Sequence, residues 1–339
     1  MPKTIFVVDD SDTNLLMAET ALESKFRVLT MPSAAKLFML LEKLTPDLIL
    51  LDIDMPEMDG FMALRRLKSQ AALADIPVIF LTSKTDSAIE ACGFELGAVD
   101  FIPKPFSAPV LQNRIKNHLD IDALIRERTA QLERIQNGIV FVLADIVEKR
   151  DCKTGGHIER VAFYAELLLD EMLARGLYAD EMRDWDMDLV IASTRLHDVG
   201  KIAISDFILN KPERLTEEEF ATIKTHTTQG ELIIDQVIAR TGEAEFLRNA
   251  KLFAGYHHES WDGAGYPYGL KNTAIPLHGR IMAIVDVYDA LVSERSYKKA
   301  LKHEEAVATI TAATGKFDPS IVEAFLAVQG QFKTVTGIT

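Results

Sequence analysis

The sequence predicts a multidomain chain in which an α/β domain built on a parallel sheet is followed by an all-α domain. Before residue 120, continuous apolar runs alternate with helical patterns, which is typical of strands covered on both faces. Beyond residue 140, the apolar residues recur at helical spacing instead of alternating as in strands. The length of 339 residues also suits about two domains.

Composition and charge narrow the class of protein. With 48% hydrophobic residues the chain can build globular cores, and no apolar run approaches the roughly 20 residues that a membrane span requires. A strand-like run begins directly after the N-terminus without a signal peptide, so we expect a cytoplasmic protein with no membrane partner. Cys92 and Cys152 provide no disulfide framework, which suits a reducing compartment. The net charge of -14 argues against binding a nucleic-acid polymer through a broad basic surface, but it leaves room for a small phosphorylated ligand.

Polar residues follow the apolar runs of the first domain. The runs at 5–8, 48–51, 78–81 and 99–102 are the predicted strands, and the residues after them include Asp9, Asp10, Asp52, Thr82 and Lys104. In an open parallel sheet the site lies beyond the carboxyl ends of the strands. Carboxylates that meet there repel one another unless a hard cation such as Mg²⁺ joins them, and one carboxylate can accept a phosphoryl group. Each Asp could instead cap a helix, but the agreement of four strand ends favours a site.

Residues 3–120 resemble the receiver domain of two-component response regulators. The matching motifs are Val7-Val8-Asp9-Asp10, Leu51-Asp52-Ile53-Asp54-Met55-Pro56, Leu81-Thr82-Ser83 and Phe101-Ile102-Pro103-Lys104-Pro105. The resemblance implies a flavodoxin-like fold with a five-stranded parallel sheet, a phosphoacceptor at Asp52, and a sensor histidine kinase as partner. It also implies Mg²⁺ held by Asp9, Asp10, Asp52 and the backbone carbonyl of Asp54, and switch residues at Thr82, Phe101 and Lys104.

Residues 121–146 are predicted to form a helical linker between a receiver domain at 1–120 and a second domain at 147–339. Between residues 110 and 150, only Gly138 interrupts a stretch otherwise free of glycine and proline. Apolar residues recur there every seven positions, at Ile125, Leu132, Ile139 and Ile146, with Ile135 and Val142 interleaved as a second seam. Two interpretations stay open: pairing with a second copy, which would give a homodimer, or one long helix docked on its own domain. Arg128 at a seam position weakens the first.

Five histidines of the second domain occupy positions that are unusual for a plain helical core. His197 and Asp198 lie in His197-Asp198-Val199-Gly200-Lys201, which follows a helical apolar run, and Gly200 is predicted to end that helix. Another helix, predicted from the capping box Thr216–Glu219, places His226 on an apolar stripe with Phe220. The other unusual positions are His157 at the start of an amphipathic helix, the pair His257-His258 after an apolar segment, and Asp286 inside an apolar run.

Together these groups supply neutral imidazoles and carboxylates, the donor mixture that suits iron, manganese, nickel or zinc rather than Mg²⁺ or Ca²⁺. A single six-coordinate ion cannot easily take all seven side chains, which are His157, His197, Asp198, His226, His257, His258 and Asp286. Two ions that share one carboxylate can, and two ions roughly 3.5 to 4 Å apart form a clamp for in-line displacement at phosphorus. A purely structural histidine cluster is the alternative, but buried polar groups without partners are rare.

The second half of the chain resembles the HD-GYP family of cyclic di-GMP phosphodiesterases. The resemblance rests on the His197-Asp198 motif together with His257-His258-Glu259-Ser260-Trp261-Asp262-Gly263-Ala264-Gly265-Tyr266-Pro267, and on Asp286-Val287-Tyr288-Asp289. It implies an all-α HD-type domain that holds two transition-metal ions, with iron as the first expectation. One ion would be held by His157, His197, Asp198 and Asp286, and Asp198 would bridge to a second ion held by His226, His257 and His258.

The family also implies contacts with the substrate. Lys201 would contact the scissile phosphate or protonate the leaving oxygen, so Lys201 and Asp198 are the expected catalytic residues. Arg295 and Lys298 match a phosphate-contacting pair, and a solvated charge run is the alternative for both. Tyr266 lies on a loop that would shape the nucleotide site or recruit partners such as diguanylate cyclase domains.

One position departs from the family pattern. Members with a third metal carry a glutamate four residues before the first histidine, where this chain has Lys153. A protonated lysine cannot ligate a metal ion and repels a nearby dication. We therefore expect two ions, with Lys153 adding positive charge beside the substrate, and mainly linear pGpG as product rather than complete hydrolysis to GMP. The family's Arg-Pro-Tyr also reads Arg295-Ser296-Tyr297 here.

Three functional hypotheses follow from these patterns. The first is a response regulator whose phosphorylation at Asp52 controls dimetal hydrolysis of cyclic di-GMP. The second is a catalytically weak signalling module that binds cyclic di-GMP or a diguanylate cyclase through the Gly265-Tyr266-Pro267 loop, but the complete ligand set favours the enzyme. A third hypothesis is an HD-type phosphohydrolase acting on a nucleotide polyphosphate, against which the Gly-Tyr-Pro loop argues.

Overall fold

The computed structural model describes residues 2–83, 87–150, 156–294 and 299–334. The chain divides into two compact units, Met1–Leu132 and Glu133–Thr339. The division falls inside the predicted linker, whose own boundaries stay a prediction. Each unit is described separately below.

The first unit is organised around a five-stranded parallel sheet, as predicted. Its strands are β1 (Thr4–Val8), β2 (Arg27–Met31), β3 (Leu48–Asp52), β4 (Val78–Thr82) and β5 (Asp100–Pro103), in the order β2-β1-β3-β4-β5. The register is regular: Val7 of β1 lies beside Thr30 of β2 and Leu50 of β3. Because every strand runs in the same direction, the ends of β1, β3, β4 and β5 meet at one edge of the sheet.

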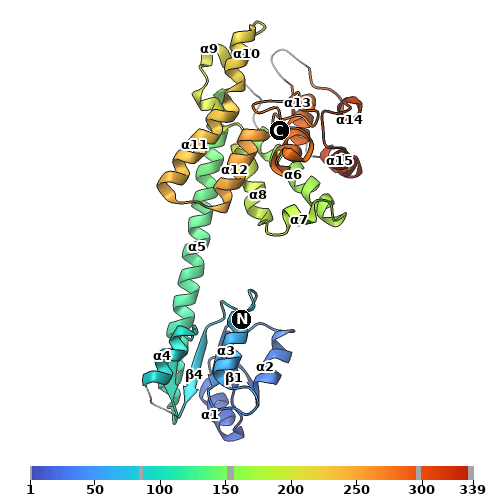
Figure 1. Ribbon diagram of the computed structural model, residues 1–339. Coiled ribbons are helices and arrows are strands. Elements are labelled where there is room, and N and C mark those ends of the chain that lie inside the picture. Colours follow the sequence, from blue (N-terminus) through green and yellow to red (C-terminus); the bar gives the residue numbers. More distant parts are fainter. Residues whose placement is uncertain (1, 84–86, 151–155, 295–298, 335–339) are drawn as a thin grey trace. The chain divides into compact units, whose positions relative to one another are not determined.

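Helices cover both faces of this sheet (Figure 1). They are α1 (Asp12–Leu22), α2 (Ala34–Leu41), α3 (Gly60–Lys68), α4 (Ser87–Glu95) and the first part of α5 (Ala108–Arg150). Side chains alternate across a strand, so Phe6 and Val8 belong to the core under α2 and α3, whereas Ile5 and Val7 belong to the core under α1 and α5. The strands are therefore buried on both faces, which explains their continuous apolar runs.

The helix α5 passes through the predicted linker. Near its C-terminal end, Ala144 and Val147 are buried in the second unit. The predicted seam faces away from this contact, and its members are 50% to 68% exposed: Ile125, Leu132, Ile135, Ile139, Val142 and Ile146. Exposure of the seam is what pairing with a second copy would require.

Among its described residues the second unit contains helices and loops but no strand, in agreement with the predicted fold class. Its α-helices are α6 (His157–Ala174), α7 (Ala179–Met182), α8 (Met187–Ser193), α9 (Asp206–Leu209), α10 (Glu217–Lys224), α11 (His226–Thr241), α12 (Glu245–Tyr256), α13 (Leu277–Val292), α14 (His303–Ala312) and α15 (Pro319–Phe332). Three 3-10 helices join them: η1 (Thr194–Leu196), η2 (Val199–Ala203) and η3 (Asn272–Ala274). The main core lies among α6, α13 and α15, where the rings of Tyr164 and Phe332 stack at 4.5 Å between centroids.

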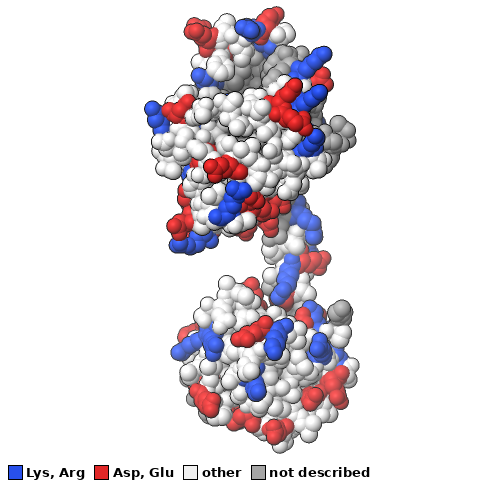
Figure 2. All heavy atoms as spheres, turned by 90° about the vertical axis from the view of Figure 1, so that its right-hand side faces the viewer, with Lys and Arg blue, Asp and Glu red and all other residues white. Residues whose placement is uncertain are grey.

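Surface charge and hydropathy bear on the classes of partner. On the face shown in Figure 2, acidic and basic side chains are interspersed, and no broad basic surface is visible among the described residues. None of the described helices is both long enough and apolar enough to cross a membrane.

Candidate functional site

The first candidate site lies at the carboxyl edge of the sheet. Asp9 and Asp52 are buried, Asp10 is exposed, and each offers a carboxylate oxygen within 4.8 Å of the other two. Asp54 is exposed and lines, with Asp52, an open cleft of about 440 Å³. Oxygen donors at this spacing suit a hard cation such as Mg²⁺.

Lys104 compensates the buried negative charge at this edge. Its ammonium group donates to Asp9 Oδ2 at 2.5 Å and to Asp52 Oδ1 at 2.7 Å. Burial raises the pKa of Asp52, and the hydrogen bond and charge of Lys104 only partly offset that effect. Thr82 is buried at the end of β4, and Phe101 is buried with its ring 5.3 Å from that of Phe80. The strand ends thus bring Asp9, Asp52 and Lys104 into contact, and Thr82 and Phe101 lie on the neighbouring strands β4 and β5.

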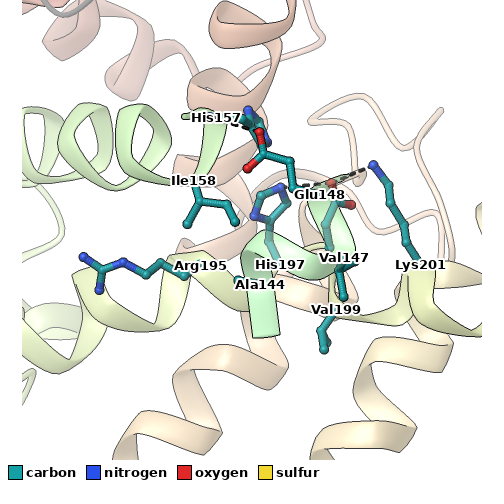
Figure 3. Close-up of a pocket in the computed structure, with 10 residues that line it drawn as sticks. Ala144, Val147, Glu148, His157, Ile158, Arg195, His197, Val199 and Lys201 are labelled. Carbon is teal, nitrogen blue, oxygen red and sulfur yellow. Dashed lines mark hydrogen bonds and ion pairs between the residues drawn. The ribbon is translucent and has the colours of Figure 1, made fainter. Parts of the chain in front are cut away.

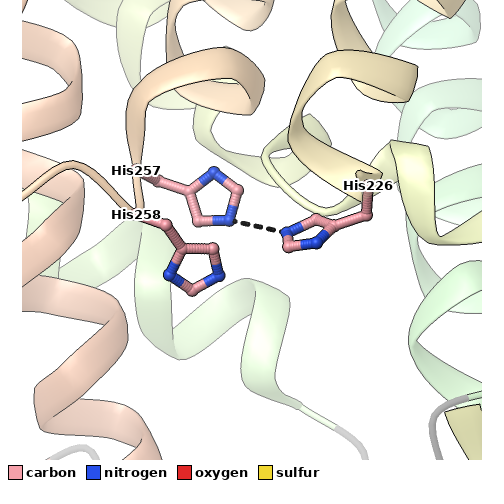
Figure 4. A group of neighbouring side chains, drawn as sticks. All are labelled: His226, His257 and His258. Carbon is pink, nitrogen blue, oxygen red and sulfur yellow. Dashed lines mark hydrogen bonds between the residues drawn. The ribbon is translucent and has the colours of Figure 1, made fainter. Parts of the chain in front are cut away.

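The second candidate site lies in the helical unit, where five elements present the seven predicted ligands. His157 is the first residue of α6, His197 and Asp198 lie between η1 and η2, and His226 begins α11. The pair His257-His258 follows α12, and Asp286 lies within α13. Figure 4 shows the imidazoles of His226, His257 and His258 turned toward one another.

Each of four histidines is held by its Nδ1 atom. His197 contacts the carbonyl oxygen of Thr194 at 2.9 Å, and His226 contacts that of Ile223 at 2.7 Å. The corresponding contacts are those of His257 to Phe253 O and Ala254 O, both at 3.0 Å, and of His157 to Asp289 Oδ2 at 2.7 Å. A carbonyl or carboxylate oxygen at Nδ1 accepts a hydrogen bond from Nδ1–H, so the Nε2 atom is left as the metal-binding nitrogen.

The predicted ligands form two groups that share Asp198. Its Oδ2 atom lies 3.4 Å from His197 Nε2, and its Oδ1 atom lies 3.5 Å from His226 Nε2 and 3.7 Å from His257 Nε2. Within His157-His197-Asp198, and likewise within His226-His257-His258, the candidate ligand atoms lie within 4.8 Å of one another. Asp286 joins the first group, with its Oδ1 atom 3.7 Å from His157 Nε2.

These groups fit a pair of metal ions. The Nε2 atoms of His157 and His197 are buried and have no hydrogen-bond partner within the described part of the chain. Such orphaned acceptors are costly unless something satisfies them. They line, with Glu148 and Lys201, a cavity of about 10 Å³, which is room for roughly one water-sized group (Figure 3). The donor set of imidazoles and carboxylates suits a first-row transition metal.

Burial keeps most of the imidazoles neutral. It lowers the pKa of His226, lowers that of His257 well below its ordinary value, and lowers the pKa of His258 to about 3. Burial also opposes protonation of His197, but the charge and hydrogen bond of Asp198 together with the charge of Asp286 outweigh it and raise the pKa of His197. Neutral imidazole is the form that binds a metal ion, so the site is suited to ions at neutral pH.

Lys201 brings a cation to the edge of this cluster. Its Nζ atom lies 2.7 Å from Asp198 Oδ2, and both side chains are largely buried. The two residues are three apart in sequence, and η2 places them on the same side. Lys201 is therefore close enough to the shared carboxylate to meet a phosphate held beside it.

Tyr266 lies on the other flank of the cluster. Its ring stacks on that of His258 at 4.7 Å between centroids, and its amide donates to the carbonyl oxygen of His258 at 3.1 Å. Burial raises the pKa of Tyr266, so its phenol stays protonated. The Gly265-Tyr266-Pro267 segment thus forms part of the wall of the site.

Comparison with known proteins agrees with this architecture. A model of the response regulator receiver domain matches residues 5–116, and a model of the HD domain matches residues 142–321. A "Probable cyclic di-GMP phosphodiesterase" of Vibrio cholerae serotype O1 is 39% identical over 97% of this chain and 78% of its own length. The chain belongs to the HD-GYP response regulators.

Two further relatives align with most of the chain, and one of them is named a response regulator. The "Cyclic di-GMP phosphodiesterase response regulator RpfG" of Xanthomonas campestris pv. campestris is 36% identical over 86% of this HD-GYP response regulator and 78% of its own length. A "Cyclic di-GMP phosphodiesterase" of Thermotoga maritima is 32% identical over 98% of this chain and 92% of its own length. HD domains of this kind are metal-dependent, which agrees with the two ligand groups.

One expectation about the HD motif is wrong. Gly200 is predicted to end the helix before it, but α8 already ends at Ser193, and Gly200 lies inside the 3-10 helix η2. Gly200 instead allows close packing, because a Cβ atom there would lie 1.8 Å from the carbonyl oxygen of His226. The glycine therefore lets the HD motif approach the start of α11.

The helix expected from the Thr216 capping box is also different. The capping box is present, but the helix breaks at Thr225 into α10 and α11. Phe220, expected on the buried stripe, is 46% exposed, whereas His226 is buried as expected. The break puts His226 at the beginning of a helix, where its side chain is aimed into the cluster.

Sequence reasoning overlooked three buried carboxylates around the site of this HD-GYP response regulator. Asp289 contacts His157, and Glu148 accepts the main-chain N–H of His157 at 3.1 Å. Glu259 accepts main-chain N–H groups of Tyr268 at 2.7 Å and Leu270 at 2.9 Å, so it anchors the loop that carries Tyr266. Of these three carboxylates, only Asp289 could have been predicted from the sequence. It follows Asp286 by three residues on an apolar helix, so the two lie on the same face. The predicted substrate contacts Lys153, Arg295 and Lys298 lie outside the described residues.

Proposed function

We propose that this protein hydrolyses cyclic di-GMP at a dimetal centre and that phosphorylation of its receiver at Asp52 controls this activity. The observation that carries the proposal is the pair of ligand groups that share Asp198. The names of relatives that align over most of the chain support cyclic di-GMP as the substrate.

Two ions bound by these groups would supply Lewis acidity for the phosphodiester and would activate water for attack. His157, His197, Asp198 and Asp286 would hold one ion, and His226, His257, His258 and the shared Asp198 would hold the other. We propose iron as the first choice, with manganese, nickel or zinc as alternatives, because imidazole and carboxylate donors suit each of them.

The side chains of the protein would bind and orient the substrate. Lys201 would hold the scissile phosphate or give a proton to the leaving oxygen, and Asp198 would keep that ammonium group in place through their contact of 2.7 Å. Tyr266 would line the nucleotide site beside His258. Arg295 and Lys298 would contact phosphate. Lys153, in place of a carboxylate that could bind a third ion, supports linear pGpG as the main product, with GMP as a lesser one.

A sensor histidine kinase would supply the phosphoryl group to Asp52. Mg²⁺ held by Asp9, Asp10, Asp52 and the Asp54 carbonyl would neutralise the incoming charge. Lys104, already 2.7 Å from Asp52, and Thr82 would contact the transferred group. The exposed seam of α5 supports a homodimer through which phosphorylation would alter the second domain.

The test is turnover of cyclic di-GMP by metal-reconstituted protein, with product identification and metal analysis on the same sample. We expect about two ions per chain, linear pGpG as the main product, and no turnover by Asp198→Ala. Binding of cyclic di-GMP without turnover would instead support a signalling module. Three ions per chain would contradict the role given to Lys153. If Asp52 is the control point, the activity of Asp52→Asn should be the same whether or not a phosphoryl donor is present.

A further inference from the structure

His157 is held differently from the other histidines of the cluster whose Nδ1 contacts the structure describes. The Nδ1 atoms of His197, His226 and His257 contact neutral main-chain carbonyl oxygens. That of His157 contacts a carboxylate, Asp289 Oδ2, at 2.7 Å. Both side chains of this pair are at least 96% buried. A charged acceptor in a buried environment polarises the imidazole far more strongly than a carbonyl does.

The carboxylate of Asp289 is itself fixed from several directions. Arg160 donates to it through Nε at 2.7 Å and through Nη2 at 3.0 Å, and the Ser293 hydroxyl donates to it at 3.2 Å. The Arg160 Nη2 atom also donates to the Ser293 hydroxyl at 3.0 Å. With two donor side chains around it besides His157, the carboxylate cannot easily rotate away from His157.

The arrangement follows from helical spacing on two neighbouring helices. On α13, Asp286 and Asp289 are three residues apart, so both face α6. On α6, His157 and Arg160 are also three residues apart and meet the same carboxylate. The helix that contributes the ligand Asp286 thus also contributes the group that orients His157.

We propose that Asp289 is a positioning residue that supports one of the two ions, the ion held by His157, and does not support the other. The proposal rests on the proposed dimetal site. Asp289 holds His157 with Nε2 directed at the ion and raises the basicity of that nitrogen, as outer carboxylates do for metal-bound histidines. The group of His226, His257 and His258 has no described contact with Asp289, so its ion is left unaffected.

The competing role for Asp289 is purely structural, as the counter-charge of buried Arg160. Loss of such a counter-charge would destabilise the whole helical unit and would weaken the binding of both ions together. If Asp289 is a positioning residue, its loss weakens the binding of one ion only. The two roles therefore differ in how many ions are affected.

The experiment titrates metal-free full-length protein with Mn²⁺, comparing wild type with Asp289→Asn, which removes the charge at nearly constant size. We expect wild type to bind two Mn²⁺ ions per chain and the variant to bind one of them 10- to 100-fold more weakly, in the range that loss of an outer-sphere partner produces. Electron paramagnetic resonance provides the second readout. At a Mn²⁺ concentration that fills both wild-type positions, the variant should show the six-line signal of an isolated ion in place of the coupled pair.

The control is Ser293→Ala, which removes another contact with the same carboxylate and leaves His157 and Arg160 in place. It should bind both ions as wild type does.

Wild-type affinity for both ions in Asp289→Asn, or an equal loss of both ions with a lower melting temperature, would overturn the proposal. If Asp289→Asn does not fold, Arg160→Gln decides the point: selective weakening of one ion supports it, and unchanged binding overturns it. Failure of wild type to bind any ion would instead reject the proposed dimetal function.

Discussion

His226, His257 and His258 show how burial prepares single residues for chemistry. Burial lowers the pKa of each below the usual 6.5, so each imidazole is neutral at pH 7 and can donate a lone pair. In His226 and His257 the Nδ1 atom contacts the main chain, so the lone pair is on Nε2, and the two Nε2 atoms lie 3.2 Å apart.

Lys201 is the residue whose loss should separate metal binding from turnover. Replacing it as Lys201→Met keeps the length of the side chain but removes the ammonium group beside Asp198. We expect kcat to fall by about 10² to 10⁴, the range for loss of a general acid, while the metal content stays at two ions. Steady-state kinetics and metal analysis measure these quantities. Lys211→Met is the matched control, because Lys211 pairs with Glu219 outside the cluster, and a similar loss there would contradict the role of Lys201.

His278 gives a prediction about pH and stability. It is buried beside Asn249, and burial, followed by the charge of Arg280, lowers the pKa of His278 to about 4. The unfolded chain therefore binds a proton at His278 at higher pH than the folded chain does. The contribution of neutral His278 to the free energy of unfolding is fully present above pH 6.5. It is lost as the pH falls toward 4, and the total loss is about 3 kcal/mol.

Urea unfolding of wild type and His278→Gln at several pH values between 7.5 and 4 checks this prediction. The variant should lose less free energy of unfolding than wild type over that interval, since glutamine does not titrate. Parallel curves for the two proteins would show that His278 does not carry the effect.

At the scale of elements, Gly200 decides how η2 approaches α11. A Cβ atom at this position would lie 1.8 Å from His226 O and 2.4 Å from Gly230 N, both of them main-chain atoms. We expect Gly200→Ala to cost about 3 kcal/mol in the free energy of unfolding, at the upper end for overpacking, and to weaken metal binding because His226 must move. Denaturant unfolding and metal analysis are the measurements.

Gly138 provides the control for that substitution. It lies within α5, and a Cβ atom there would meet nothing within 4 Å. Gly138→Ala should therefore stabilise the helix by about 0.5 to 1 kcal/mol, because alanine is the better helix former. Equal effects of the two substitutions would show that close packing at Gly200 is not the cause.

The seam of α5 makes a prediction about assembly. Ile139 is 56% exposed, and Leu132, one heptad earlier, is 68% exposed. If the seam pairs two copies, Ile139→Lys should convert a dimer to a monomer, because a charge would be buried in the pair. Light scattering measures the mass. Asn137→Lys, an exposed position two residues away and off the seam, should leave the dimer intact, and a wild-type monomer would reject the pairing.

At the scale of the whole molecule, metal ions should stabilise the helical unit. Ions that bind only the folded state add to the free energy of unfolding, about 2.7 kcal/mol for one ion at a concentration 100 times its Kd. Removing these ions with a chelator, while excess Mg²⁺ keeps the receiver site filled, should lower the melting temperature of the helical unit and leave that of the receiver unit unchanged. Calorimetry of wild type and Asp198→Ala tests this. The variant should not respond to the chelator, and an equal response would locate the stabilising ions elsewhere.

Sequence reasoning succeeded where chemistry is tied to local pattern. Asp9, Asp52 and Lys104 were predicted to meet because parallel strands end at one edge of a sheet, and they do. The HD domain and its family followed from motifs that are contiguous in sequence. It failed where neighbours come from distant segments: His157 and Asp289 are 132 residues apart, and their contact depends on how α6 and α13 pack.

The sequence by itself determined the two fold classes, the strand ends that carry carboxylates, and the residue types that suit metal ions, because each depends on spacing of 2 or 3.6 residues along one segment. Tertiary structure alone decided which nitrogen is left for an ion in four of the histidines, why Gly200 must be glycine, and which carboxylate orients His157. The physical reason is that these features depend on burial and on contacts between helices, and neither is encoded in the pattern of any single helix.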